Sequence, residues 1–325
     1  MSHYTHFTTE ERELSRELKA LGYSICKIAE RLGRNKSSVS REFKRNSNKD
    51  GSYSAHGADD RYKQRRKNCG RKPMLQNDSP LKDYVVEKLS LDWSPDEISH
   101  RAKLDKEAFS ISYNTIYRAI DTGIISKKMR NHLRIKRIKN RKAKNSDKRG
   151  KIADRVMISD RPESINDRKE IGHWESDTIL GKRNTGCIAT HVERVTGFLI
   201  AFRLPNLRDD KFRIKTVDVF NKLPSALKKS FTVDNGNEFR SHSELAAQTG
   251  MDVYFCDPYS PWQRGTNENT NGLLRQYFPK GTSFMEFSDD YLDYVVSLIN
   301  NRPRKRLGYK TPAEVFIESF SKCCT

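Results

Sequence analysis

The chain has 325 residues, enough for two or three domains and a sizeable core, which excludes a small disulfide-stapled protein. It carries 62 Lys and Arg against 42 Asp and Glu, for a net charge of +20, a pI near 9.7 and a mean hydropathy of −0.85. The most apolar stretch, Phe198 to Phe202, is far shorter than the roughly 20 residues of a bilayer span, and no apolar signal region precedes Glu13. We therefore expect a cytoplasmic protein without a membrane segment.

Positive charge is concentrated in the first half of the chain. Residues 1–150 hold 36 basic and 19 acidic side chains, a difference of +17, whereas residues 151–325 hold 26 and 23, a difference of +3. Such asymmetry is typical of a surface that binds a polyanion, because each Lys or Arg near a phosphate releases condensed counterions. Nucleic acid is the leading partner, and an anionic membrane surface is the second.

Residues 1–46 predict a helix-turn-helix DNA-binding domain. A first helix ends at Gly22, a second runs from Ser24 to Leu32, and a third follows a turn at Gly33. The same pattern also fits a solvated basic helix on an ordinary three-helix bundle. In the DNA-binding interpretation, the outer face of the third helix presents the candidate contacts Lys36, Ser37, Ser38, Arg41 and Lys44.

The next two segments predict a basic connector and a second helical domain. Residues 47–77 are polar and then basic, as is typical of a connector. Residues 78–125 repeat a three-helix pattern, and the last helix, Ser112 to Ile120, exposes Asn114 and Arg118. This segment is either a second helix-turn-helix, with these two residues on DNA, or a plain helical spacer.

Residues 126–163 predict a basic linker. Within it, residues 127–151 hold 13 Lys or Arg and one acidic residue, Asp147, so the segment is too charged to pack by itself. It is a disordered, solvated linker or an arm that orders along a phosphate backbone, and the two are compatible.

Residues 164–325 predict an α/β domain. Three runs rich in β-branched and aromatic residues, Trp174 to Leu180, Cys187 to Glu193 and Gly197 to Leu204, indicate an antiparallel meander. Helices and strands alternate after it, with a strand from Phe231 to Asp234. This order predicts a mixed sheet with flanking helices.

Acidic residues in this domain occupy positions that solubility does not explain. Asp177 lies inside a predicted strand, where a carboxylate needs a compensating cation. Glu175 shares its face, so periodicity alone does not choose between them. Asp234 ends a strand, where α/β sheets bind ligands, although Asp-Asn-Gly is also ordinary turn chemistry.

Glu268 is the third candidate carboxylate. It lies on a predicted helix with Asn271 and Arg275 on the same face, and taken alone such a glutamate is usually just solvated. Three carboxylates from two strands and a helix, beside a strongly basic arm, suit phosphodiester chemistry. That chemistry uses hard, oxygen-ligated cations such as a pair of Mg²⁺ ions.

Several runs of the chain resemble the IS-thirty family of bacterial insertion-sequence transposases. The resemblance covers nearly the whole chain and includes the amino-terminal helix-turn-helix. Its motifs are Gly172 to Asp177, Val233 to Phe239, Arg264 to Leu273, Tyr277 to Thr282, Asn301 to Lys305 and Thr311 to Glu314.

The resemblance implies an RNase H-like catalytic domain of the retroviral integrase type, preceded by all-α helix-turn-helix domains. Its triad would be Asp177, Asp234 and Glu268, binding two Mg²⁺ ions for which Mn²⁺ can substitute. The resemblance thus selects Asp177 over Glu175, and it assigns Arg275 to a phosphate contact. Ser176 and Thr178 depart from the glycine and aliphatic residue that the family usually carries at these positions.

The leading hypothesis is a DNA transposase that binds the terminal inverted repeats of an element and joins its ends to target DNA. Water and then a freed 3′ hydroxyl would be the nucleophiles. Because two ends must be joined, we expect a homodimer or larger oligomer on double-stranded DNA, held at the bacterial nucleoid through that DNA. The alternatives are a DNA-binding regulator with a non-catalytic RNase H-like domain and an RNase H-type nuclease without strand transfer.

Overall fold

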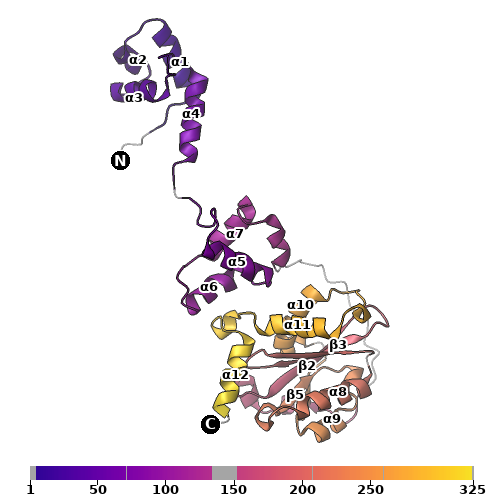
Figure 1. The fold of residues 1–325 in the computed structure, drawn as a ribbon. Helices are drawn as coiled ribbons and strands as arrows, with labels where there is room; N and C mark the ends of the chain where they lie inside the picture. The colour runs from indigo at the N-terminus through magenta and orange to yellow at the C-terminus, as the bar shows by residue number, and fades with distance from the viewer. Residues whose placement is uncertain (1–4, 71, 134–151, 207, 259, 324–325) are drawn as a thin grey trace. The chain divides into compact units, whose positions relative to one another are not determined.

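The computed structural model describes residues 5–70, 72–133, 152–206, 208–258 and 260–323 (Figure 1). The chain divides into two compact units, Met1–Gln76 and Asn77–Thr325. Among the described residues, no helix has the length and apolar character needed to cross a bilayer.

The first unit contains four helices: α1 (Thr9–Ala20), α2 (Ile25–Arg31), α3 (Lys36–Asn46) and α4 (Ala55–Lys67). The three predicted helices are therefore present. The structure differs from the sequence-based expectation at residues 47–77, which were expected to be a connector. They contain α4, which packs on α1 and α3 and extends the unit to Gln76.

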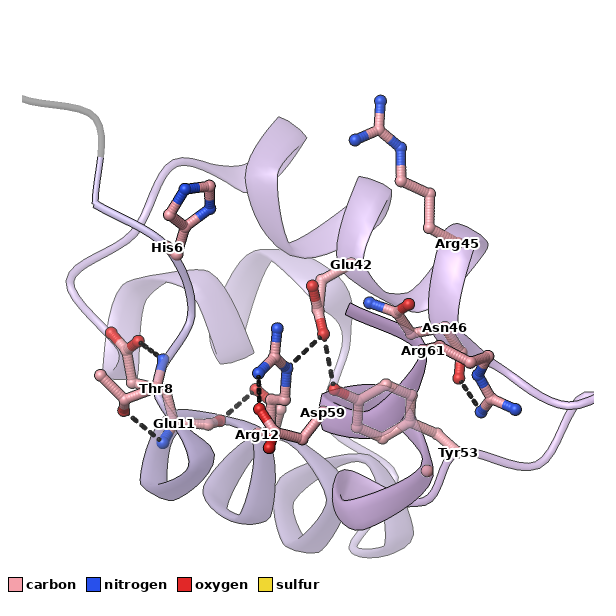
Figure 2. A network of polar contacts seen from close by, with 12 residues as sticks. His6, Thr8, Glu11, Arg12, Glu42, Arg45, Asn46, Tyr53, Asp59 and Arg61 are labelled. Carbon is pink, nitrogen blue, oxygen red and sulfur yellow. Dashed lines mark hydrogen bonds and ion pairs between the residues drawn. The ribbon is translucent and has the colours of Figure 1, made fainter. Parts of the chain in front are cut away.

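A buried arginine ties three helices of this unit together (Figure 2). Arg12 on α1 is 1% exposed. Its Nε lies 2.9 Å from Oε1 of Glu42 on α3, and its Nη1 lies 2.7 Å from Oδ1 of Asp59 on α4. Tyr53 donates a further hydrogen bond to Glu42. A buried guanidinium tolerates this environment because both of its partners are charged and hydrogen-bonded to it.

Replacing this arginine is expected to loosen the first unit. Arg12→Met removes the shared cation and leaves Glu42 without a charged partner and Asp59 with Lys63 alone, which costs about 3–5 kcal/mol. Hydrogen exchange of the amides of α1, α3 and α4 in the full chain measures the loss. Arg16→Met is the matched control, because the Arg16 side chain is 55% exposed, and a comparable loss in this variant contradicts the assignment.

The second unit begins with three helices, α5 (Pro80–Ser90), α6 (Pro95–Leu104) and α7 (Tyr113–Thr122), followed by the 3-10 helix η1 (Lys127–His132). The predicted second three-helix pattern is therefore present. The part of the basic arm from residue 134 to residue 151 lies outside the described residues, so the two interpretations of the arm stay open.

Two capping glutamates connect α6 to the end of the chain. Glu97 accepts the amide of its N-cap residue Ser94 and also binds Arg302, with Nε 3.0 Å from its Oε2. Reciprocally, Glu314 accepts the amide of Thr311 at the start of α12 (Pro312–Cys323) and binds both terminal nitrogens of Arg101. The structure therefore places these helices in one compact unit with the sheet, whereas the sequence suggested separate domains joined by a linker.

A six-stranded mixed sheet forms the centre of this unit, in the order β1-β6-β5-β2-β3-β4. The strands are β1 (Val156–Met157), β2 (His173–Leu180), β3 (Cys187–Glu193), β4 (Leu199–Leu204), β5 (Ser230–Val233) and β6 (Asp252–Phe255). Strands β2, β3 and β4 form the predicted antiparallel meander, and β5 pairs with β2 in parallel. The short β1, which pairs with β6, lies within the segment that was expected to be a linker.

Helices cover both faces of the sheet (Figure 1). On one face, α8 (Asp209–Asn221) and α9 (His242–Thr249) enclose an aromatic core that includes Trp174, Phe212, Phe220 and Phe231. On the other face, α10 (Gly265–Tyr277) and α11 (Asp289–Asn300) pack on Ile179, Ile188 and Val192. The alternation of side chains along β2 therefore directs odd-numbered residues toward α10.

His191 lies at the centre of the aromatic core. It is fully buried against the rings of Phe212 and Phe220 and hydrogen-bonds through Nδ1 to the hydroxyl of Ser176 at 2.7 Å. Burial lowers the pKa of His191 from 6.5 to about 3, so the folded protein keeps this imidazole neutral.

This histidine is expected to make the fold sensitive to acid. The unfolded chain binds a proton near pH 6.5 and the folded chain does not, so stability is complete above pH 6.5 and falls as the pH drops toward 3. The contribution to the slope is at most about 1.4 kcal/mol per pH unit. Urea unfolding of His191→Gln across this range should show a flatter slope than the wild type. His56→Gln, whose ring is 90% exposed, should not.

Candidate active site

The sheet register brings two of the predicted carboxylates together. In the parallel pair of β2 and β5, His173 lies opposite Ser230 and Glu175 lies opposite Thr232. The same offset, carried two residues further, places Asp177 beside Asp234, which directly follows the end of β5. Asp234 accepts the amide of Gly236 at 2.9 Å, so its turn also orients its carboxylate.

One arginine bridges these two aspartates. Arg264 precedes α10, and its Nη1 and Nη2 each lie 3.3 Å from a carboxylate oxygen, the first of Asp177 and the second of Asp234. Its Nη1 also donates to the carbonyl of Ser176. The two aspartates are 26% and 33% exposed, so they remain accessible from solvent. The compensating cation expected for Asp177 is thus, in this structure, a guanidinium.

The charges of this site modify one another. Burial raises the pKa of Asp177, the negative charge of Asp234 raises it further, and Arg264 acts in the opposite direction. Burial alone would lower the pKa of Arg264, but the two carboxylates outweigh it and raise the pKa. The site therefore favours a positive charge beside Asp177.

Two asparagines fasten α10 to β2 beside the aspartates. The Asn267 amide N–H donates to Oε2 of Glu175 at 2.9 Å, and its side chain donates to the Glu175 carbonyl at 2.8 Å. One turn further, Asn271 donates from Nδ2 to Oδ2 of Asp177 at 3.1 Å and to Oδ1 of Asn267 at 2.7 Å. Glu175 and Asp177, two residues apart on β2, thus contact Asn267 and Asn271, which are four residues apart on α10.

The two acidic residues that periodicity left undecided have different environments. Glu175 is 0% exposed and is bound by Arg194, whose Nη1 lies 3.2 Å from its Oε1, in addition to the Asn267 amide. Asp177 opens to solvent beside Asp234. The geometry therefore makes Glu175 a buried structural ion pair and leaves Asp177 at the accessible site.

The third carboxylate does not join the other two in this conformation. Glu268 is exposed on α10, three residues before Asn271, and no group of three acidic, His or Cys side chains that could hold a metal ion occurs among the described residues. This differs from the expected convergence of all three. Arg264 offsets only one of the two negative charges of the aspartates, and a third carboxylate beside them adds repulsion, so Glu268 gains by remaining in water.

A further carboxylate that the sequence analysis missed lies next to the site. Glu238 is 7% exposed and accepts a 2.7 Å hydrogen bond from the hydroxyl of Thr178. A side chain on Gly236 would collide with the carboxylates of both Glu238 and Asp234, which explains glycine in this turn. Thr178 and Ser176, which depart from the family pattern, are therefore hydrogen-bonding residues here, to Glu238 and His191 respectively.

Arg264 and Asn267 were also missed by the sequence analysis. An isolated arginine in a loop carries no periodic signal. The signal available for Asn267 was its spacing. Asn267, Asn271 and the buried Leu274 lie at i, i+4 and i+7, on one face of the helix.

Arg275, expected at a phosphate, contacts the backbone. Its Nη2 donates to the carbonyl of Leu180 at 2.9 Å and its Nη1 to that of Phe278 at 3.3 Å, while burial lowers its pKa. These bonds join the end of β2 to the end of α10. A phosphate contact by this residue stays a prediction.

The predicted recognition helix α3 presents its candidate residues to solvent. Lys36, Ser37, Arg41 and Lys44 are exposed and Ser38 is half-buried. Asn35 caps the helix through the Ser37 amide, and the Ser37 hydroxyl accepts from Arg41 at 3.2 Å. In the second unit, Asn114 and Arg118 are exposed on α7.

Two family models match the chain. A helix-turn-helix domain matches residues 3–46, and an integrase core domain matches residues 167–261. These matches and the fold define a DNA-binding protein with an integrase-type catalytic domain, an enzyme class that depends on divalent metal ions.

Curated relatives share most of their length with this chain. Transposase InsI for insertion sequence element IS30C of Escherichia coli (strain K12) is 39% identical over 95% of this chain and 83% of its own. The transposase for element IS1086 of Cupriavidus metallidurans is 38% identical over 97% and 95%. The transposase for IS4351 of Bacteroides fragilis is 37% identical over 96% and 95%. The chain belongs to the IS30 family of insertion-sequence transposases, as the resemblance implied.

The different environments of the two acidic residues on β2 predict opposite effects of substitution. Glu175→Gln leaves buried Arg194 without its charged partner and is expected to cost about 3–5 kcal/mol of stability. Asp177→Asn, at an accessible site, should change stability by less than about 1 kcal/mol while abolishing strand joining. Urea unfolding combined with a DNA-joining assay checks both, and equal stability losses contradict the division of roles.

Proposed function

We propose that Asp177, Asp234 and Glu268 are the catalytic carboxylates of this transposase, which cuts the ends of its element and joins them to target DNA. The observation that carries the proposal is the shared cationic partner of Asp177 and Asp234, since two aspartates from neighbouring strands are directed at one positive group. Glu268 lies on α10, the helix that Asn271 ties to Asp177.

The donor set suits a hard divalent cation. Asp177 and Asp234 offer carboxylate oxygens, and Oδ1 of Asn271 is buried and lacks a hydrogen-bond partner among the described residues. We propose that the three carboxylates hold two Mg²⁺ ions, or Mn²⁺ in their place, with Glu268 turning inward as Arg264 releases the aspartates. Bound ions would activate the attacking oxygen and stabilise the leaving one.

The reaction conserves phosphodiester bonds after its first cut. Water attacks the phosphorus at the element end, and the bond to the flanking strand breaks to leave a 3′ hydroxyl. That hydroxyl then attacks a target phosphodiester, forming one such bond as another breaks. Neither ATP nor a covalent protein intermediate is therefore required. The role of this chain's residues is to hold the carboxylates in register and keep their charge balanced.

Two helical elements are proposed to hold the DNA. The outer face of α3, with Lys36, Arg41 and Lys44, would bind the terminal inverted repeats. Asn114 and Arg118 on α7 would contact flanking DNA, and Arg275 a backbone phosphate near the site. Because both element ends must be held at once, we propose a homodimer or larger assembly on DNA.

Strand joining by matched variants tests the proposal. Labelled element ends are incubated with plasmid and Mg²⁺, using the wild type, Asp234→Asn and Glu268→Gln. Both variants should lose cleavage and joining by at least about a thousandfold while binding the end DNA as the wild type does, because they retain the shape of each side chain.

Each alternative function predicts a different result from this assay. Binding by the wild type without metal-dependent nicking would support a DNA-binding regulator. Nicking without joining would support a nuclease. Full activity of Glu268→Gln would remove Glu268 from the catalytic set, whereas Asp290→Asn on α11 is the control that should remain active.

A further inference from the structure

A basic pocket of about 340 Å³ lies beside the first turn of α10. Four cationic residues line it, Arg168, Arg304, Lys305 and Arg306, and of the described residues at its wall none is acidic. Arg304 and Lys305 belong to the Asn301 to Lys305 motif. The proposed catalytic site does not use this motif. The pocket is distinct from the carboxylates, although α10 adjoins both.

The first turn of α10 forms part of the wall of this pocket. Gly265 and Thr266 line it, and the N-cap residue of the helix makes no side-chain capping bond. A Cβ added to Gly265 would meet nothing within 4 Å, so a ligand can approach this backbone closely. The positive end of the helix dipole and the cationic side chains around it favour an anion.

A buried hydroxyl at the pocket wall lacks a partner. Thr266 is 8% exposed, and its Oγ1 has no hydrogen-bond partner among the described residues. Its neighbour Asn267 donates its amide to Glu175, so that amide is already used. An unpartnered buried hydroxyl is costly, and an anionic oxygen in the pocket would satisfy it.

In this pocket the positive charge of Arg168 acts on Arg306, and the carboxylates of Glu193 and Glu175 act on it in the opposite direction. Arg306 donates from Nη1 to the carbonyl of Val195 at 2.7 Å, and any side chain on Gly197 would collide with its guanidinium. Burial lowers the pKa of Arg306, and the charge of Arg168 lowers it further. The nearest carboxylate of Arg168, on Glu175, lies 3.7 Å away and is shared with Arg194. A bound anion would offset this repulsion.

We propose that this pocket binds one backbone phosphate of the DNA strand on which the enzyme acts. The inference rests on the proposed function, because it names a strand contact made by the same catalytic unit. DNA is favoured over a free anion because Arg264, which binds the catalytic aspartates, immediately precedes Gly265 and Thr266, the first two of the four α10 residues that line the pocket. When a DNA strand lies at the carboxylates, we therefore expect a neighbouring phosphate of that strand to lie near the start of α10.

Salt dependence of DNA binding by the full chain tests the proposal. The affinity for a duplex carrying one element end and its flank is measured by fluorescence anisotropy over a series of KCl concentrations. Lys305→Gln and Arg306→Gln should each lower the slope of log affinity against log salt by about 0.9 and weaken binding equally for all end sequences. Thr266→Val should weaken binding about tenfold with no change of slope.

The control is Lys222→Gln on α8, whose ammonium group pairs with Asp218 at 3.0 Å. This variant loses the same charge outside the pocket and should keep the wild-type slope. An equal loss of slope in the control would overturn the proposal, because the effect would then be one of net charge. If Arg306→Gln fails to fold, Lys305→Gln and Thr266→Val decide, since Lys305 is exposed and Thr266→Val removes an unpaired group.

Titration of inorganic phosphate into the wild type and Arg306→Gln, followed by calorimetry, separates the two sources of phosphate. Wild-type heat that Arg306→Gln lacks, together with a lowered DNA slope, supports a DNA phosphate. The same heat with unchanged slopes overturns the DNA assignment. Joining by the wild type is assayed in parallel: failed joining with lowered slopes refutes the proposed function alone, and normal joining with unchanged slopes refutes this inference alone.

Discussion

The active site depends on a match between two repeat distances. Residues two apart on a strand and four apart on a helix are both separated by about 6 Å. Glu175 and Asp177 on β2 can therefore face Asn267 and Asn271 on α10 simultaneously. The first pair is buried and fixes the helix, and the second lies at the opening of the site. A shift of either element by one residue would break both pairs.

Charge balance explains why the two strand aspartates tolerate their position. Parallel pairing of β2 with β5 brings Asp177 beside Asp234, and this proximity is unfavourable unless a cation lies between them. Arg264 supplies that cation from the residue before α10, so the helix that the asparagines hold also delivers the neutralising group. The position of α10 thus sets both the geometry and the electrostatics of the site.

The sequence predicts those parts of the molecule whose signals are periodic. The meander β2 to β4 alternates clearly, and the α3 helix follows a capping Asn35, so both elements appear where expected. Helix α4 was missed because it is polar and basic around most of its circumference, and β1 because two residues carry no alternation. Both elements form through tertiary contacts, of α4 with α1 and α3 and of β1 with β6, and a local sequence pattern does not show such contacts.

The site could also be predicted only as far as local sequence patterns allow. Asp177 and Asp234 could be selected as unusual carboxylates, but their meeting depends on register, and register was not visible in the sequence. Arg264 opens the Arg264 to Leu273 motif, but its role at the aspartates was not assigned, because a loop arginine is ordinary by composition. The exposure of Glu268 was also not predicted, since helical position alone does not say whether a carboxylate turns toward two others or toward water.

The contacts between α6 and the carboxyl-terminal segment give the second helical element a defined role in the catalytic unit. Glu97 and Glu314 each cap their own helix and each bind an arginine from the other segment, so breaking this connection would also uncap two helices. Using α6 for this connection leaves the outer face of α7, with Asn114 and Arg118, exposed to solvent. A DNA segment held by α7 would therefore be mechanically coupled to the sheet that carries the aspartates. The N-terminal helix-turn-helix belongs to a separate compact unit, Met1–Gln76.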